Sequence, residues 1–192
     1  MLALSTAELR VLDWIAAHCH TPFLDAVFPW ITSLGFAGII WIVLALVLLC
    51  VPGQRGYGVQ LALALLLSAL FCNLILKNAV GRIRPYELAG IAELLVDPPW
   101  DASFPSGHTS AGIACATVLL RNRHPLRWLV LILAVLIALS RLYLYVHFPT
   151  DVLAGALLGV LCGLLAAGLW RKLLLPKLLR IKEKRQHSKN AP

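Results

Sequence analysis

The stretch VLAGALLGVLCGLLAAGLW, residues 152–170, is uncharged and almost wholly apolar. A helix needs about 20 apolar residues to cross the hydrocarbon core of a bilayer, so this stretch is expected to span a membrane. The whole chain agrees, because 60% of its 192 residues are hydrophobic, 14% are charged and the mean hydropathy is +0.83. A soluble domain of this size needs more polar surface. We therefore interpret residues 1–192 as one membrane-embedded domain that ends in a basic tail, residues 171–192.

The remaining apolar segments predict an all-α transmembrane bundle. The five predicted spans cover residues 34–51, 56–76, 109–120, 128–146 and 152–170. The third is short, since Arg121 ends it, and the fourth contains Arg141. An arginine inside a membrane segment is costly and therefore marks a candidate functional site.

The N-terminal part is less clear. Residues 7–17 place Leu9, Leu12 and Ile15 on one helical face, which predicts an amphipathic helix at the membrane interface. A sixth span through residues 11–33 is the alternative.

Lysine and arginine predict the orientation of the bundle. Arg55, the arginines that join spans three and four, and the basic tail share one end, which the positive-inside rule assigns to the cytoplasm. Eight of the seventeen Lys and Arg residues lie in the tail, directly after a span, where a basic segment favours contact with anionic lipid over nucleic acid. The opposite end receives the loop of residues 86–106, which has no Lys or Arg and four acids: Glu87, Glu93, Asp97 and Asp101.

The fifth span carries a stripe of small residues, since Gly155, Gly159 and Gly163 recur at intervals of four. Such a stripe lets another helix approach closely. Continued backwards by the same interval, it reaches Asp151 and His147, so both polar side chains are expected to point into the bundle.

Three polar segments converge at the outer end of the predicted bundle. They lie at the exit of span two, at the entry of span three and in the turn between spans four and five. In order they read Lys77-x6-Arg84-Pro85, Pro105-Ser106-Gly107-His108, and Ser140-Arg141-x5-His147-x3-Asp151.

The residue types in these segments suit phosphoryl transfer. Lys77, Arg84 and Arg141 can neutralise a phosphate, and Ser106-Gly107 opens a helix whose N-terminal N–H groups can bind an anion.

Two histidines, His108 and His147, permit one to attack phosphorus while the other protonates the leaving oxygen. Asp151 can orient the imidazole of His147. Arg82 is consistent with either a phosphate contact or a lipid headgroup contact.

The three segments, in this order, resemble the signature of the type 2 phosphatidic acid phosphatase superfamily, and every signature position is filled. The resemblance implies that His147 is the nucleophile that forms a phosphohistidine, Asp151 its orienting partner and His108 the general acid. It implies a metal-independent phosphatase without a cofactor, in which the phosphate is held by the remaining residues: Lys77, Arg84, Ser106, Gly107 and Arg141. The expected substrate is a membrane lipid, as in similar bacterial enzymes that act on undecaprenyl diphosphate, phosphatidylglycerophosphate or phosphatidate.

Two other functions are weighed against this one. A vanadium-dependent haloperoxidase has a similar anion site, but those relatives are larger and soluble. An anion or lipid-phosphate transporter without hydrolytic activity is the alternative from another class. Five short helices without a repeated half argue against alternating access, and a transporter does not need the His147–Asp151 pair.

Overall fold

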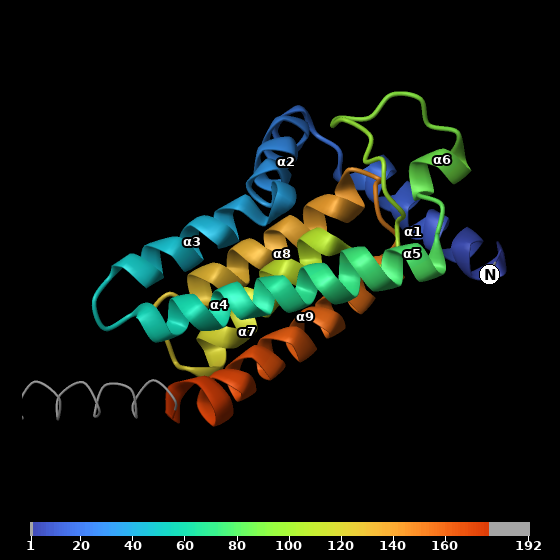
Figure 1. The fold of residues 1–192 in the computed structure, drawn as a ribbon. Helices are drawn as coiled ribbons and strands as arrows, with labels where there is room; N and C mark the ends of the chain where they lie inside the picture. Colours follow the sequence, from blue (N-terminus) through green and yellow to red (C-terminus); the bar gives the residue numbers. More distant parts are fainter. Residues whose placement is uncertain (1, 177–192) are drawn as a thin grey trace, which may run out of the picture.

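The computed structural model describes residues 2–176, and all regular secondary structure within that range is helical (Figure 1). This confirms the all-α prediction for the described part of the chain. Most of the basic tail lies outside those residues. Five helices run side by side as a bundle (Figure 1). They are α3 (Ile39–Cys50), α4 (Arg55–Ser68), α7 (Gly107–Arg121), α8 (Arg127–Tyr143) and α9 (Pro149–Leu169).

Helix α4 continues without interruption through a π-helical segment, Ala69–Leu76, into α5 (Lys77–Val80). The chain then turns at Gly81, whose φ of 58° lies in the left-handed region that favours glycine. A short helix, α6 (Pro85–Ala89), follows. Helices α5 and α6 lie at the end of the bundle opposite the α3–α4 turn (Figure 1).

The glycine stripe of α9 packs directly on the backbone of α7. A Cβ added at Gly155 would lie 2.6 Å from the carbonyl oxygen of Ser106, and one at Gly159 would lie 2.6 Å from that of Ser110. Any side chain at these positions would force the two helices apart. The predicted close helix packing is therefore confirmed, and it fixes the start of α9 against the start of α7.

The N-terminal region forms two helices, α1 (Leu2–Cys19) and α2 (Pro22–Leu34). The helix breaks between them because Thr21 caps α2, accepting a hydrogen bond from the N–H of Leu24 (3.2 Å), and Pro22 occupies the first turn. One continuous sixth span through residues 11–33 is therefore wrong.

The apolar face predicted for residues 7–17 contacts protein as well as the exterior. Leu12 is fully buried with Tyr145 and Phe148 in the turn between α8 and α9, and Leu9 and Ile15 pack on the same cluster. The amphipathic pattern is confirmed, and its apolar face packs on the α8–α9 turn.

The exterior of the bundle is apolar. Large exposed side chains cover it, among them Ile42, Leu46, Leu66, Leu129, Ile132 and Leu157. Among the described residues, two helical segments are long and apolar enough to cross a membrane, Arg55–Ala89 and Pro149–Leu174. The pair Pro22–Leu34 and Phe36–Cys50, bent by 41°, is a third if it counts as one span. These features indicate a membrane location, while the count of five spans stays a prediction.

Candidate active site

A cavity of about 920 Å³ opens at the end of the bundle that carries α5 and α6. Six of the eight predicted site residues line it: Lys77, Arg84, Gly107, His108, Arg141 and His147. The other two adjoin these residues, because Ser106 precedes Gly107 at the N-cap of α7 and Asp151 contacts His147. The structure thus brings together residues that lie up to 74 positions apart in the sequence, between Lys77 and Asp151. Their individual roles stay predictions.

His147 lies in the turn between α8 and α9 and is 1% exposed. Its Nε2 atom lies 3.3 Å from an NH1 donor of Arg84. Because a guanidinium group only donates, Nε2 must carry the lone pair. Burial lowers the pKa of His147, although Asp151 opposes the shift. A neutral imidazole with its lone pair at Nε2 has the form required of a nucleophile.

The other ring nitrogen of His147, Nδ1, lies 3.6 Å from Oδ2 of Asp151. This distance is slightly too long for a hydrogen bond, so Asp151 acts on the neutral imidazole through its charge and its proximity. Asp151 itself is fully buried and tightly held. Its carboxylate accepts from the hydroxyl of Ser103 (2.5 Å), the backbone N–H of Phe148 (2.9 Å) and the guanidinium of Arg82 (2.6 Å). The orientation of this carboxylate is therefore set by three donors that do not line the cavity.

Two of the predicted phosphate-binding cations are paired with an acid that the sequence analysis did not select. Lys77 Nζ and Arg84 NH2 both donate to the carboxylate of Asp101, the latter over 2.5 Å. Arg84 Nε also donates to the backbone carbonyl of Asp101 over 2.8 Å. Burial alone would raise the pKa of Asp101, but the bonds from Lys77 and Arg84 lower it below its ordinary value. The carboxylate of Asp101 is therefore ionised and pairs with both Lys77 and Arg84.

The third predicted cation, Arg141, keeps a free donor. Its side chain is almost fully buried, and NH1 donates to the hydroxyl of Thr32 in α2 over 2.5 Å. Its Nε has no hydrogen-bond partner among the described residues. Buried donors of charged groups are rarely left unpaired, because the loss of hydration is costly. Arg141 also lines the cavity, so its positive charge lies beside the space that a phosphate would occupy.

The start of α7 differs in one respect from the expectation. The backbone N–H of Ser106 donates to the carbonyl of Asp151 over 3.0 Å, so that this group is not free for a phosphate. Gly107 and His108 follow as the first helical residues and line the cavity. The His108 ring packs against the α2–α3 junction, where a Cβ on Gly35 would lie 2.9 Å from it.

Arg82, which the sequence left open between a phosphate and a headgroup contact, is engaged with protein groups in the structure. It binds Asp151 and Glu8, and its guanidinium lies 3.9 Å from the centre of the Phe148 ring. Four residues were missed altogether by sequence reasoning: Glu8, Thr32, Asp101 and Ser103. Asp101 alone carried a signal, as one of the acids in a loop without basic residues.

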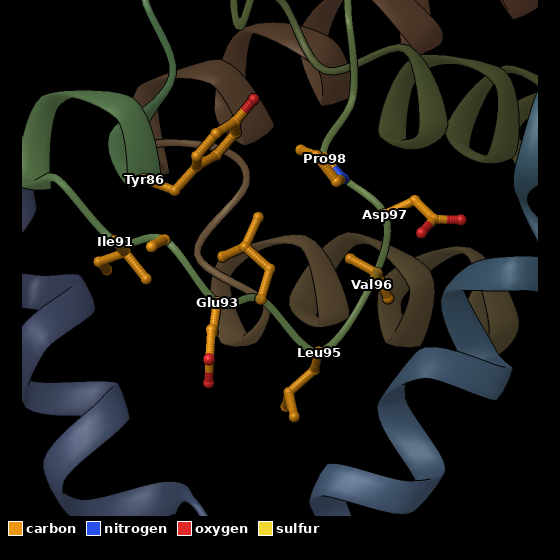
Figure 2. Close-up of a pocket in the computed structure, with 9 residues that line it drawn as sticks. Tyr86, Ile91, Glu93, Leu95, Val96, Asp97 and Pro98 are labelled. Carbon is orange, nitrogen blue, oxygen red and sulfur yellow. The ribbon is translucent and has the colours of Figure 1, made fainter.

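A second hollow, of about 530 Å³, lies along the loop after α6 (Figure 2). Its lining includes Tyr86, Ile91, Val96 and Pro98, and none of the predicted site residues belongs to it. The side chains of Glu93 and Leu95 point away from Tyr86 (Figure 2). This hollow has no group suited to phosphate chemistry, so we assign the site to the larger cavity.

Metal ligation has no obvious place in this site. Within residues 2–176, no three His, Cys, Asp or Glu side chains are grouped in a way that would hold a metal ion. Metal-independent activity stays a prediction that experiment must test.

Known proteins with this sequence pattern and fold identify the family. Residues 57–174 match the model of the PAP2 superfamily. An undecaprenyl-diphosphatase of Sulfolobus acidocaldarius is 34% identical over 121 residues, which are 62% of this chain and 58% of that protein. A crystal structure described as the first transmembrane PAP2 type phosphatidylglycerolphosphate phosphatase, from Bacillus subtilis, has a TM-score of 0.72 and 26% identity, covering 90% of this chain and 89% of that one. Aquifex aeolicus LpxE has a TM-score of 0.70 and 31% identity, covering 82% of this chain and 93% of its own. The resemblance seen in the three motifs is thereby confirmed, and the chain belongs to the PAP2 superfamily.

Proposed function

We propose that this protein is an integral membrane phosphatase that removes phosphate from a lipid phosphomonoester or diphosphate. One observation carries the proposal: three cations and two histidines line a single cavity at one end of an apolar helical bundle. The names of the relatives favour undecaprenyl diphosphate and phosphatidylglycerophosphate as substrates. Phosphatidate remains a third candidate on the family resemblance.

The proposed reaction begins when the substrate phosphate displaces the Asp101 carboxylate from Lys77 and Arg84. Arg141, which lines the same cavity, adds a third positive charge. These cations stabilise the charge that spreads over the phosphate oxygens in the transition state. A metal ion would otherwise have to supply this charge, so catalysis should not need one.

His147 Nε2 then forms a bond to phosphorus as the bond from phosphorus to the lipid oxygen breaks. His108 protonates the departing oxygen, and the product alcohol or lipid phosphate leaves. Water next attacks the phosphohistidine and gives a proton to His108, which returns to its protonated form. Cleavage of the P–N bond releases inorganic phosphate and restores the neutral imidazole of His147. Throughout, Asp151 stabilises the positive charge of the substituted imidazole.

The lipid chain is proposed to remain among the helices. The cavity continues from the cations to apolar side chains on α2, α3, α4 and the short 3-10 helix between α2 and α3 (Phe36–Gly38), namely Pro29, Phe36, Ile42 and Leu65. Each methylene buried there contributes roughly 0.8 kcal/mol. We therefore expect the substrate to enter sideways from the membrane. A long-chain lipid phosphate should exceed glycerol 3-phosphate in kcat/KM by orders of magnitude.

We further propose five spans, with the cavity on the non-cytoplasmic face and the C-terminus in the cytoplasm. The arginines of the α3–α4 and α7–α8 connections (Arg55, Arg121, Arg123, Arg127) support this orientation, because both connections lie at the end opposite α5 and α6 (Figure 1). Single cysteines in residues 87–100 of a cysteine-free variant should react with an impermeant thiol reagent in intact cells. Cysteines beyond Lys182 should react only after the membrane is opened, and the reverse pattern would contradict the orientation.

The activity itself is tested by assaying one detergent preparation against a panel of lipid phosphates and diphosphates. Release of inorganic phosphate from at least one of them is expected, and the ranking names the preferred substrate. Transport of a lipid phosphate or anion by reconstituted protein, with no phosphate released from any member of the panel, would favour the transporter alternative.

A further inference from the structure

Arg82 lies between two buried carboxylates that come from opposite parts of the chain. Its NH1 donates to Oδ1 of Asp151 over 2.6 Å, and its NH2 donates to Oε2 of Glu8 over 2.5 Å. Asp151 is fully buried and Glu8 is 6% exposed. The arginine does not line the cavity that holds Lys77 and Arg84. Its contacts are therefore directed at the partner of His147, away from the proposed phosphate.

Glu8 completes this arrangement from α1. Its second oxygen, Oε1, accepts from the backbone N–H of Thr150 (2.9 Å) and from the Thr150 hydroxyl (2.6 Å). Thr150 is in the first turn of α9, where an unpaired N–H favours a carboxylate. One glutamate thus holds both the arginine and the start of the helix that carries Asp151.

The backbone closes the same network on its other side. The N–H of Ser103 donates to the carbonyl of Arg82 over 2.8 Å, and the Ser103 hydroxyl donates to Asp151. This backbone hydrogen bond fixes Arg82 and Ser103 relative to each other, and the side chains of both donate to the carboxylate of Asp151.

The charges in this group explain why two acids share one arginine. A buried carboxylate stays ionised only if it is paired and hydrogen-bonded, and Arg82, Ser103 and Phe148 together meet that need for Asp151. A lone arginine would neutralise Asp151 and weaken its effect on the imidazole. Glu8 offsets this, because the three groups together carry one net negative charge next to His147.

We propose that Arg82 and Glu8 are positioning residues, which hold Asp151 oriented toward His147, set the net charge beside it and connect helix α1 to the active site. This inference rests on the proposed nucleophilic role of His147. The other charged or titratable groups around His147 are Lys77, Arg84, Asp101, His108 and Arg141, and the test leaves them unchanged.

The experiment compares Arg82→Gln, Arg82→Lys and Glu8→Gln in the full-length protein, in detergent, with its best lipid substrate. Arg10→Gln and Glu93→Gln are matched controls, since both side chains are exposed and neither belongs to the network. The measurements are kcat, KM, the pH dependence of kcat/KM and the melting temperature.

We expect Arg82→Gln to lower kcat by about 10- to 100-fold, with little change in KM, as for other residues that orient a reacting group. In this variant Ser103 and Phe148 still donate to Asp151, so its carboxylate stays ionised. Losing the positive charge of Arg82 then raises the pKa of His147, so the acid limb of kcat/KM should move to higher pH. Glu8→Gln removes a negative charge and should move the limb to lower pH, with a smaller loss of kcat. Arg82→Lys should restore part of kcat and leave the acid limb near its original pH.

Opposite shifts of the acid limb are the decisive result, since a merely structural role would not produce them. Shifts in the same direction, or none, would overturn the inference. A raised KM with unchanged kcat would instead make Arg82 a substrate contact. If Arg82→Gln does not fold, Glu8→Gln and Arg82→Lys decide by the same criteria. A wild type without activity, or an active His147→Ala variant, would refute the proposed function itself.

Discussion

Two aspartates at this site lie in regions of very different character. Asp151, at the start of α9, is fully buried and accepts three hydrogen bonds from groups that do not line the cavity. The side chain of Asp101, in the loop before α7, is 34% exposed, and its carboxylate rests on Lys77 and Arg84. The carboxylate of Asp151 is held in place by the surrounding fold. The carboxylate of Asp101 instead accepts hydrogen bonds from two side chains that could bind a phosphate. The difference teaches that burial and the identity of the donors, more than charge, separate a fixed acid from a displaceable one.

The surroundings of the two residues differ in the same way. The α8–α9 turn is held from two helices, because Tyr145 donates to Asp13 of α1 and Tyr143 donates to Asp25 of α2, each over 2.6 Å. In the outer loop, by contrast, Trp100 next to Asp101 is 98% exposed. A firmly held His147 beside an exposed loop is consistent with the proposed site, which would have to admit a lipid headgroup.

The largest expected effect comes from removing the nucleophile. His147→Ala should abolish phosphate release, because no second group at the fixed end of the site can accept the phosphoryl group. Steady-state assays with the preferred lipid substrate measure the loss. Near-normal turnover by this variant would refute the mechanism.

Changing the fixed acid should have the next largest effect. Asp151→Asn keeps the geometry but removes the charge that stabilises the substituted imidazole, so we expect a loss in kcat of roughly 10³- to 10⁴-fold. The same kinetic assay checks it, and a melting curve controls for folding. A loss of less than tenfold would mean that this buried acid has no special role.

Changing the displaceable acid should act on binding, in the opposite direction. Asp101→Asn removes a competitor for Lys77 and Arg84, so vanadate and inorganic phosphate should inhibit several-fold more strongly, while kcat changes little. Asp97→Asn, an exposed change in the same loop, is the control.

The effect of Asp101→Asn should also be independent of pH in the neutral range. Because the pKa of Asp101 is lowered, its carboxylate stays ionised from about pH 6 to about pH 8 and competes equally throughout. Weaker inhibition by vanadate in this variant would show that Asp101 positions the two cations instead of competing for them. The contrast between the two aspartates would then fail.

The smallest effect is expected from metal removal. Lys77, Arg84 and Arg141 supply the positive charge at the cavity, so excess EDTA should leave kcat/KM unchanged. Loss of activity that added magnesium restores would contradict the proposed charge neutralisation.

The sequence predicted the meeting of the three motifs because the signals for it are local. Apolar runs give the ends of the helices, and the interval of four in α9 gives the face on which Asp151 lies. The same interval does not apply to His147, because α9 begins at Pro149 and His147 lies in the preceding turn. The contacts of Arg82 could not be predicted, because its partners are 74 and 69 positions away in the sequence. Which acid it meets depends on where α1 crosses the bundle. An amphipathic pattern such as that of α1 does not distinguish a lipid surface from a protein one.

Asp101 was missed for a related reason. Four acids occupy the outer loop, and only the path of the backbone between α6 and α7 selects the one that reaches Lys77 and Arg84. The expectation of free N–H groups at the start of α7 was wrong in part, because the backbone N–H of Ser106 donates to the carbonyl of Asp151. That hydrogen bond depends on the close approach of α9 to α7. The glycine stripe permits this approach but does not determine which residues of the two helices face each other.

The most direct test of the central claim is to trap the covalent intermediate at His147. The protein is mixed with a lipid substrate carrying a radiolabelled phosphate, quenched in alkali within milliseconds to seconds and digested for peptide mapping. We predict a base-stable, acid-labile label on the peptide that contains residue 147, absent from His147→Ala. Label on any other residue, or phosphate release by the His147→Ala variant without labelled protein, would contradict the account.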